Sequence, residues 1–513
     1  HRVRLTLRPD AELHQHQLDN ERAKLDRLQH SLSDTDQQAI VDQALALKAR
    51  QEEEDDVGQL PKVTLADVKP DVKRIAPIAE GAITRYQAGT NGLGYQQWYL
   101  PLPDLSVEEL TLLPLYTALL TEVGAGDKDY LGMQQWQAAR TGSVSVYSQF
   151  RSPLESVDRV GGYLVLSGRA LVRHFDELTQ ILTQHWSAPR FDEKTRIRDL
   201  LTQLCARREQ SVTGQGHSLA MQTAGSFHSR ANALTYDMGG LPSIRRLKAW
   251  LKDFKTDDSR FDTWLAQLSG LHAKLSDQRA LAVLVADAAE LDGLAKLTEQ
   301  YGLAQRTDSL AAPDQSAQLT AAGQRLAWVV NTQVNFCSAA YPTVLPEHED
   351  SAALTVLGGV LRDNYLHRTI REQGGAYGGG ASHDSNTGTF RFYSYRDPRI
   401  DGTLADFRAS LDWIRDSGVT AEQVESSILG VVSSMDKPGS PAGEAKQAFQ
   451  NRLFGRTDAF RKAYREALLA VTPSDVSRVA ERYFDPAAAS EAVVTDRDNA
   501  DRLAGQGFSI ETL

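Results

Sequence analysis

Apolar residues at the start of the chain follow two different periods. In residues 1–10, valine and leucine alternate with arginine and threonine, which is the pattern of a strand with one buried face. A lone strand is unstable, so we expect residues 1–10 to close a domain upstream of this chain. In residues 11–58 leucines recur at helical spacing in two charged segments, with Ser33 and Asp36 placed as a capping box between them. This pattern predicts a helical hairpin that links domains, and a disordered charged linker is the alternative.

From about residue 60 onward, strand and helix patterns alternate, and their order occurs twice. The short apolar segments 281–287 and 491–496 are the strands that close the two copies. Between the copies, near Thr307–Ser316, alanine, proline and aspartate replace the apolar periodicity. We therefore predict an α+β fold with two homologous domains, 59–308 and 309–513. Each domain is expected to be a mostly antiparallel sheet with helices packed on one face.

Composition narrows the class of protein. The 513 residues are 41% hydrophobic and 24% charged, which is typical of a soluble globular protein. The net charge is −11 and no sustained basic run follows, so we expect no nucleic-acid partner. No apolar run is long enough to span a membrane, so no membrane partner is expected either. Cys205 and Cys337 lie far apart and predict buried thiols in a reducing compartment, which favours a bacterial cytoplasmic location.

The chain lacks the common motifs that start hydrolysis. Its twelve histidines form neither H-E-x-x-H nor H-x-x-E-H, and G-x-S-x-G is absent. His14 and His16, or His348 between two glutamates, could bind a metal weakly, but solvated loops explain them more simply. The sequence therefore predicts no metal site within this chain.

One segment, LRDNYLHRTIREQGGAYGGG, combines charged and glycine-rich features. It begins at Leu361 as a helix and should stop at Gly374 and Gly375, because glycine readily enters the left-handed conformation that ends helices. Arg371 then lies in the last helical turn, and Tyr377 follows six residues later between two glycine pairs. The small residues leave the backbone open to close approach by another chain. We expect the guanidinium and the phenol to point toward the same place.

Arginine and tyrosine can assist a reaction on a peptide but cannot start one. A guanidinium is a fixed cation that donates to carbonyls, and a phenol can donate to an oxyanion as it forms. Two alternatives remain for GGAYGGG. It is either a flexible turn with a surface tyrosine or a phosphate-binding loop, although no Gly-Lys-Ser/Thr follows and the glycines come after a helix.

The stretch LHRTIREQGGAYGGG resembles the substrate-clamping motif of the pitrilysin and insulysin class of inverted-zinc metallopeptidases. The spacing from arginine to tyrosine, and GGAYGG itself, are similar to the presequence protease branch of that class. TNGLGYQQWYLPLPDL with the leucine-rich helix after it, and the charged hairpin before it, also resemble that branch. The resemblance covers nearly the whole chain, but only the C-terminal half of the family's pattern.

The resemblance implies a peptidase built from two homologous halves that close around an unstructured peptide. Arg371 would then bind substrate carbonyls, and Tyr377 would bind substrate and act catalytically by stabilising the tetrahedral intermediate. Gly378 and Gly379 would bind substrate through their backbone. Zinc would be the cofactor of the full-length protein, with its ligands in the N-terminal half of the same polypeptide. This chain alone is expected to be inactive, and a non-catalytic peptide-binding or scaffolding subunit of the same superfamily is the alternative.

Overall fold

The chain folds as two units, His1–Val63 and Thr64–Leu513. The computed structural model describes residues 3–6, 8, 10, 12–52, 61–302, 313–315 and 323–513. In these residues, no helix combines the length and apolar character needed to cross a bilayer.

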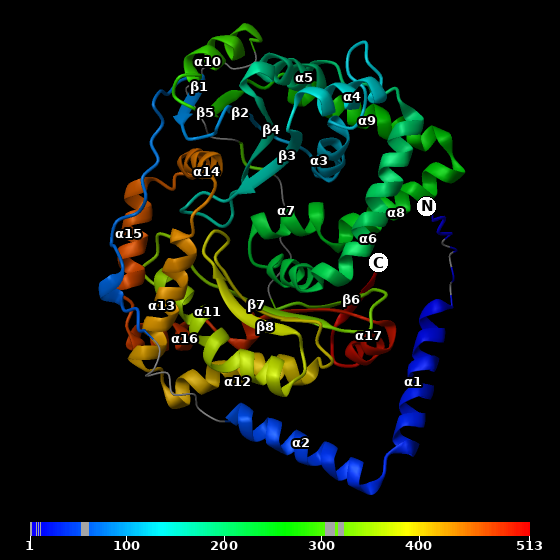
Figure 1. Ribbon diagram of the computed structural model, residues 1–513, viewed down its shortest axis with the longest axis vertical. Coiled ribbons are helices and arrows are strands. Elements are labelled where there is room, and N and C mark those ends of the chain that lie inside the picture. Colours follow the sequence, from blue (N-terminus) through cyan, green and yellow to red (C-terminus); the bar gives the residue numbers. More distant parts are fainter. Residues whose placement is uncertain are drawn as a thin grey trace. The chain divides into compact units, whose positions relative to one another are not determined.

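The first unit contains the two predicted helices, α1 (Leu13–Ser31) and α2 (Asp34–Glu52). Between them the Ser33 hydroxyl accepts the N–H of Asp36 at 3.2 Å, and the Asp36 carboxylate accepts the N–H of Ser33 at 3.0 Å. The predicted capping box is therefore confirmed. The two helices diverge from this corner (Figure 1). Both expose large apolar side chains, including Leu25, Leu28, Ile40 and Leu45.

The strand predicted at residues 1–10 is not formed in its described part. Residues 3–6 belong to no helix or strand, and Val3 is 96% exposed. A strand needs a neighbour to bond its backbone groups, and no described strand pairs with these residues. The role of residues 1–10 as the closing strand of an upstream domain stays a prediction.

The second unit begins with a five-stranded sheet and its helices. The strands are β1 (Ile83–Gln87), β2 (Leu93–Pro101), β3 (Ser143–Arg151), β4 (Gly161–Leu171) and β5 (Leu281–Ala286). The helices are α3 (Val107–Leu120), α4 (Tyr130–Arg140), α5 (Phe175–Ser187), α6 (Lys194–Gly225), α7 (Arg230–Gly239), α8 (Leu241–Thr256), α9 (Asp258–Ser276) and α10 (Leu291–Gln300). The strand order is β1-β5-β2-β4-β3, and only β1 and β5 pair in parallel.

A second sheet follows with the same plan. Its strands are β6 (Arg325–Val329), β7 (Phe336–Pro342), β8 (Gly378–Asp384), β9 (Thr389–Tyr395), β10 (Ser490–Thr495) and β11 (Ser509–Thr512). Its helices are α11 (Ser351–Leu361), a π-helix (Arg362–Gln373), α12 (Asp401–Ser417), α13 (Ala421–Asp436), α14 (Pro441–Leu453), α15 (Asp458–Leu469), α16 (Pro473–Arg482) and α17 (Arg497–Ala504). Short 3-10 turns at Leu65–Asp67, Val172–His174 and Pro486–Ala488 complete the unit.

The two sheets share one topology. The second sheet has the order β11-β6-β10-β7-β9-β8, so without β11 each strand has its counterpart at the same place in the first sheet. The parallel pair also corresponds, because β6 pairs with β10 as β1 pairs with β5. This topology confirms the predicted α+β fold with two related, mostly antiparallel sheets.

Each domain also places a helix on the second face of the other domain's sheet. The C-terminal half of α6 packs on the second sheet, where Leu219 and Ala220 share a core cluster with Trp328 and Phe336. In return, α14 packs on the first sheet through Ala442, Ala445 and Phe449, which cluster with Tyr99 and Tyr163. Figure 1 shows α6 running from one sheet to the other. The exchange joins the two domains into one unit.

One glycine permits the closest part of this exchange. A Cβ built on Gly216 of α6 would lie 2.3 Å from the Phe336 ring of β7. Any side chain there would push the helix away from the sheet, because buried cores leave no room for an added methyl group.

The predicted link near Thr307–Ser316 lies mostly outside the described residues. Its described part is held by the first domain, because the backbone N–H of Gln315 donates to the Val160 carbonyl at 2.8 Å. The Gln315 side chain is buried and donates to the Pro103 carbonyl at 2.9 Å.

Candidate functional site

Helix α11 runs directly into the π-helix that carries the predicted arginine. π-Helical turns are rare and are concentrated at functional sites. The π-helix ends at Gly374, and Gly375 adopts the left-handed conformation with φ of +81°. The Gly375 N–H donates to the Arg371 carbonyl at 3.1 Å, and the Ala376 N–H donates to the Ile370 carbonyl at 3.1 Å. The predicted stop is confirmed, while the π-helical geometry was not foreseen.

A second arginine explains why the turn begins with glycine. A Cβ on Gly374 would lie 1.9 Å from Nη2 of Arg399. That guanidinium donates to the Thr369 carbonyl at 3.2 Å and to the Asp406 carboxylate of α12 at 2.8 Å. Arg399 thus ties the end of the π-helix to α12, and only glycine at position 374 leaves room for it.

Arg371 is exposed in the last turn of the π-helix. Its Nη1 lies 3.3 Å from Nε2 of His367, one turn earlier, and Nδ1 of that histidine lies 3.4 Å from the Glu372 carboxylate. No carboxylate among the described residues forms an ion pair with Arg371 itself. Its guanidinium is therefore free to bind a ligand.

Tyr377 follows the turn with a fixed backbone and an exposed side chain. Its N–H donates to the Tyr395 carbonyl of β9 at 3.1 Å, and the residue as a whole is 68% exposed. The Tyr377 and Tyr395 rings meet nearly at right angles, with centroids 5.7 Å apart. Tyr395 in turn contacts His217 of α6 at 4.8 Å between ring centroids. Tyr377 therefore lies on the side of the second sheet that α6 covers.

The structure places Arg371 and Tyr377 on the two sides of one ordered turn. Both side chains are exposed, and no hydrogen bond or ring contact joins them in the described part of the chain. Their convergence on one bound group stays a prediction.

The two predicted substrate-binding glycines have different surroundings. A Cβ on Gly378 would meet no atom within 4 Å, whereas a Cβ on Gly379 would lie 2.8 Å from the Ile370 side chain. Gly378 thus borders open space, and Gly379 permits packing of the π-helix against β8. Among the described strands β8 pairs only with β9, so one edge of its backbone is free to bond an extended peptide.

The other candidate residues do not form a metal site. His16 lies 3.6 Å from Glu12 on an exposed helix, the His14 side chain lies outside the described residues, and Nδ1 of His348 accepts the Asp350 N–H at 3.0 Å. In the described ranges, no group of three or more His, Cys, Asp and Glu could hold a metal ion. The residues present therefore do not fit a zinc ion.

Both cysteines are free and buried, as predicted. Burial raises the pKa of the Cys205 thiol and of the Cys337 thiol, so neither is activated as a nucleophile.

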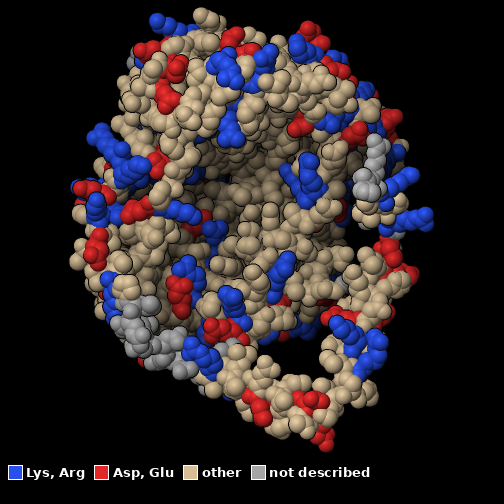
Figure 2. All heavy atoms as spheres, viewed as in Figure 1, with Lys and Arg blue, Asp and Glu red and all other residues tan. Residues whose placement is uncertain are grey.

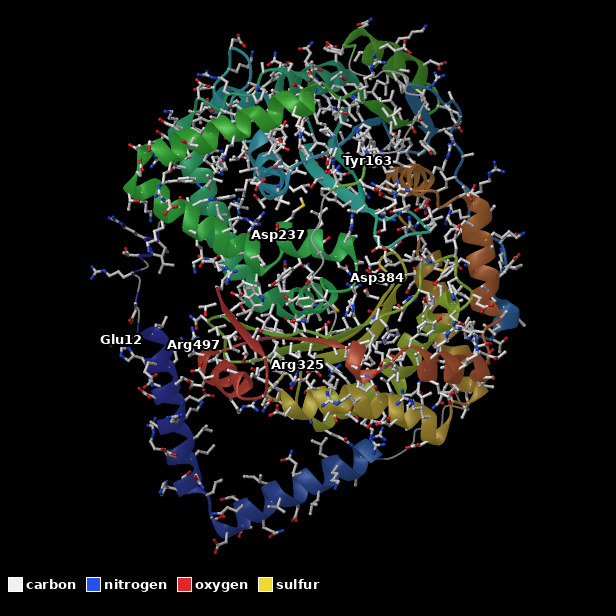
Figure 3. All side chains as sticks on the ribbon, turned by 180° about the vertical axis from the view of Figure 1, so that it is seen from behind. Glu12, Tyr163, Asp237, Arg325, Asp384 and Arg497 are labelled. Atoms are coloured by element: carbon white, nitrogen blue, oxygen red, sulfur yellow. The ribbon has the colours of Figure 1, made fainter. Side chains whose placement is uncertain are left out.

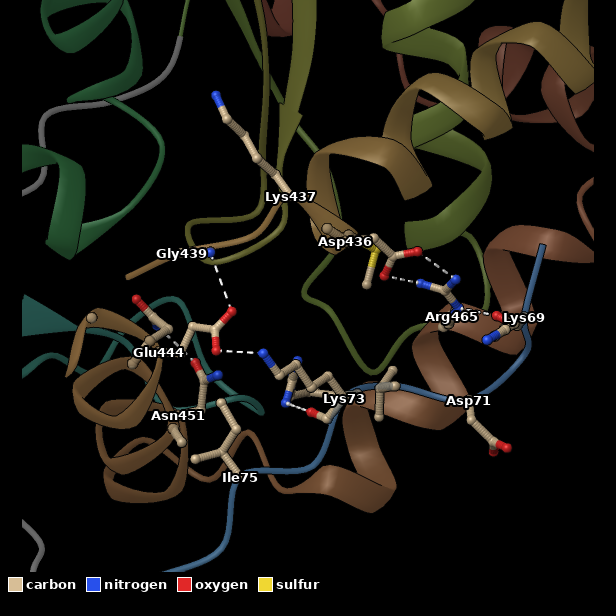
Figure 4. Close-up of a pocket in the computed structure, with 16 residues that line it drawn as sticks. Lys69, Asp71, Lys73, Ile75, Asp436, Lys437, Gly439, Glu444, Asn451 and Arg465 are labelled. Carbon is tan, nitrogen blue, oxygen red and sulfur yellow. Dashed lines mark hydrogen bonds and ion pairs between the residues drawn. The ribbon is translucent and has the colours of Figure 1, made fainter. Parts of the chain in front are cut away.

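A cavity of about 700 Å³ lies where α13 and α14 are separated (Figure 4). The buried Arg465 donates to both oxygens of Asp436, at 2.7 and 2.8 Å, and Lys73 pairs with Glu444 at 2.5 Å. Most of its charges are thus bonded to one another. None of its lining residues comes from the π-helix or β8. The sequence did not reveal this cavity, because its walls come from segments far apart in the chain.

A larger hollow faces the viewer in the second unit. Figure 2 shows that its surface is sunken between the two sheets, with Lys and Arg side chains at several places along the sides. A basic hollow next to a free strand edge is suited to an extended peptide.

Comparisons with known families cover most of the chain. The family model for the domain associated with subfamily C of peptidase M16 matches residues 7–249, and the PreP C-terminal domain matches residues 325–495. The mitochondrial presequence protease of Danio rerio is 27% identical over 94% of this chain and 49% of that protein. The mitochondrial presequence protease of Emericella nidulans is 30% identical over 84% of this chain and 42% of that protein. The chain thus spans about half the length of the curated relatives it matches.

Solved structures support the fold. A peptidase M16 inactive domain from Pseudomonas fluorescens superposes with a TM-score of 0.56 at 15% identity, covering 83% of this chain and 98% of that domain. A conserved protein from Enterococcus faecalis V583 superposes with a TM-score of 0.58 at 14% identity, over 81% of this chain and 97% of that protein.

The predicted bacterial cytoplasmic location is wrong, because the curated relatives are named as mitochondrial or as chloroplastic and mitochondrial proteins. Two unpaired cysteines report only on redox conditions and do not distinguish a cytoplasm from an organelle. The family models, the relatives and the two-sheet fold agree that this chain belongs to the peptidase M16 family, as the C-terminal half of its presequence protease branch.

Proposed function

We propose that this chain is the substrate-clamping half of a zinc-dependent endopeptidase that degrades unstructured peptides in an organelle. One observation carries the proposal. Within an M16 family chain, Arg371 and Tyr377 are exposed on an ordered turn that leads directly into the free edge of β8.

The strand edge and the two side chains have complementary roles in this proposal. An extended peptide bonds its backbone to β8 beside Gly378, where no side chain obstructs it. The guanidinium of Arg371 donates to peptide carbonyls and holds the peptide in register. The hydroxyl of Tyr377 donates to the oxygen of the attacked carbonyl as negative charge develops there.

Zinc belongs to the other half of the enzyme in this proposal. The described residues of this chain do not fit the ion, and the curated relatives are about twice as long. Zinc would supply the activated water for peptide hydrolysis. This chain would supply substrate binding and one donor to the oxyanion.

A complementation experiment tests the proposal. The purified chain, the N-terminal half of the same polypeptide and a mixture of the two are each given zinc and an unstructured peptide with a fluorophore and a quencher. We expect cleavage by the mixture alone and its loss after chelation of zinc. Cleavage by this chain alone would refute the division of roles. Complex formation and peptide binding without cleavage would instead support a non-catalytic peptide-binding subunit.

A further inference from the structure

Three arginines gather where the two domains meet. Arg151 ends β3 of the first domain, Arg391 lies in β9, and Arg456 follows α14. One carboxylate, Asp384 at the end of β8, acts on the charges of Arg151 and Arg456 and also pairs with Arg391. The cluster therefore carries a surplus of positive charge.

Two of the arginines have partners within the protein. Arg391 donates to the Asp384 carboxylate at 2.7 Å, but its Nε is buried without a hydrogen-bond partner. Arg456 is only 8% exposed, and it donates to the side-chain oxygen of Asn386 and to the Phe454 carbonyl. These bonds hold both guanidinium groups in place around the tip of the β8–β9 hairpin.

Arg151 has no such partner. Its guanidinium lies over the Phe454 ring, 5.3 Å from the centroid, and it makes no hydrogen bond or ion pair within the described part of the chain. Burial lowers the pKa of Arg151. Burial, together with the charge of Arg151, lowers the pKa of Arg456 to about 10. Two partly desolvated cations thus repel each other and lack a second anion.

The cluster is built into the domain junction and still reaches solvent. A Cβ on Gly388 of the hairpin would lie 3.0 Å from Val157, and one on Gly455 would lie 3.6 Å from Leu154, so the first domain packs closely on both segments. The side chains of Arg391 and Asp384 remain 19% and 22% exposed. Figure 3 labels Asp384 at this junction.

We propose that Arg151, Arg391 and Arg456 form a subsite for a carboxylate of the bound peptide. The identity of the ligand as a peptide rests on the proposed function. A carboxylate fits because guanidinium groups bind its two oxygens in a planar, bidentate manner. The incoming carboxylate supplies the second anion that Arg151 and Arg456 lack.

The position of the subsite sets where the carboxylate lies in the peptide. Tyr377 precedes β8 and Asp384 ends it, and the seven residues of that strand span about 20 Å. A peptide paired along β8 therefore places its carboxylate about six residues from the peptide bond held at Tyr377. The carboxylate comes either from an acidic side chain or from the C-terminus of the peptide.

Binding of labelled peptides to the full 513-residue chain tests the subsite. Three unstructured peptides are compared by fluorescence anisotropy: one with a free C-terminal carboxylate, its C-terminal amide, and the amide with one glutamate in place of glutamine. We expect a carboxylate to lower Kd by about tenfold, which is the scale of a charge-assisted hydrogen bond. The two carboxylate peptides distinguish a C-terminal from a side-chain source.

Arg151→Gln should abolish the preference for carboxylate peptides, and Arg151→Lys should restore part of it. Arg159→Gln is the matched control, because Arg159 lies in the same loop and already pairs with Asp314 at 2.8 Å. The thermal midpoint of Arg151→Gln should not fall, since an unpaired cation is removed. A large fall in midpoint with the preference retained would mean that Arg151 only joins the domains.

Equal binding of acid and amide peptides by the unaltered chain would overturn the subsite. If the isolated chain binds neither peptide, the comparison is made as KM in the mixture of the two halves, and equal KM values would overturn it. Because the binding assay needs no cleavage, loss of catalysis leaves this result intact. Cleavage without a carboxylate preference refutes the subsite alone.

Discussion

The backbone N–H of Tyr377 donates to the carbonyl of Tyr395 at 3.1 Å, and the two rings meet edge to face with centroids 5.7 Å apart. This pair fixes the base of an otherwise exposed phenol. A donor to a developing oxyanion must be held in place before the reaction, since its contribution depends on orientation. The contact with Tyr395 provides that orientation without burying the hydroxyl group.

Removal of the Tyr377 hydroxyl should slow catalysis while leaving the fold unchanged. In the mixture of both halves, Tyr377→Phe should lower kcat by on the order of 10² or more, the scale of one lost oxyanion donor. The side chain is exposed, so the thermal midpoint should stay the same. Tyr130→Phe is the control, because Tyr130 belongs to the first domain and stacks on Arg196. Unaltered kcat in Tyr377→Phe would remove the hydroxyl from the mechanism.

Neutralising Arg371 should weaken substrate binding. Arg371→Gln removes a cation with no carboxylate partner in the described residues, and we expect KM to rise by about tenfold. The exposed Arg368 of the same π-helix offers a matched control as Arg368→Gln. Steady-state kinetics on one peptide compares the two variants. Equal KM values for both would show that the net charge of the helix, and not the position of Arg371, matters.

The glycines of the turn should respond differently to the same substitution. Gly374→Ala places a methyl group against the Arg399 guanidinium and should lower the thermal midpoint, on the scale of about 1–3 kcal/mol for an overpacked site. Gly378→Ala meets open space and should keep its midpoint while raising KM for a peptide on β8. Calorimetry and kinetics separate the two effects. A stable Gly374→Ala protein would contradict the packing derived for Arg399.

Buried neutral histidines should make the fold sensitive to acid. Burial lowers the pKa of His185, of His228 and of His383 to about 4, whereas an exposed histidine titrates near pH 6.5. Between these values the unfolded chain binds more protons than the folded chain, so stability is complete above pH 6.5 and falls toward pH 4. Each histidine contributes up to ~1.4 kcal/mol per pH unit.

Urea unfolding at several pH values measures this loss of stability. His185→Gln removes one titrating group from the first domain and should flatten the dependence of the unfolding midpoint between pH 4 and 6.5. The pKa values predict no such change above pH 7. A midpoint that rises as the pH falls toward 4 would contradict the sign of the effect.

Local patterns in the sequence were enough to find the repeat and the turn. Alternation and helical spacing depend on neighbouring residues, so the closing strands and the paired helices α1 and α2 followed from them. The helix stop at Gly374 and Gly375 is also local, because it depends on the conformational freedom of glycine. Arg371 and Tyr377 were recognised from their spacing around that stop, and their exposure agrees with a role in binding.

Only the tertiary structure decided which surfaces meet. The exchange of α6 and α14 between domains, the need for Gly216 beneath Phe336, and the packing role of Gly379 all depend on residues far apart in the chain. The arginine cluster likewise joins Arg151 to Arg456 across both domains. A sequence pattern shows which face of an element is apolar, but many partners satisfy an apolar face equally well. The choice among them is made by shape and charge in the folded core, where distant segments first come into contact.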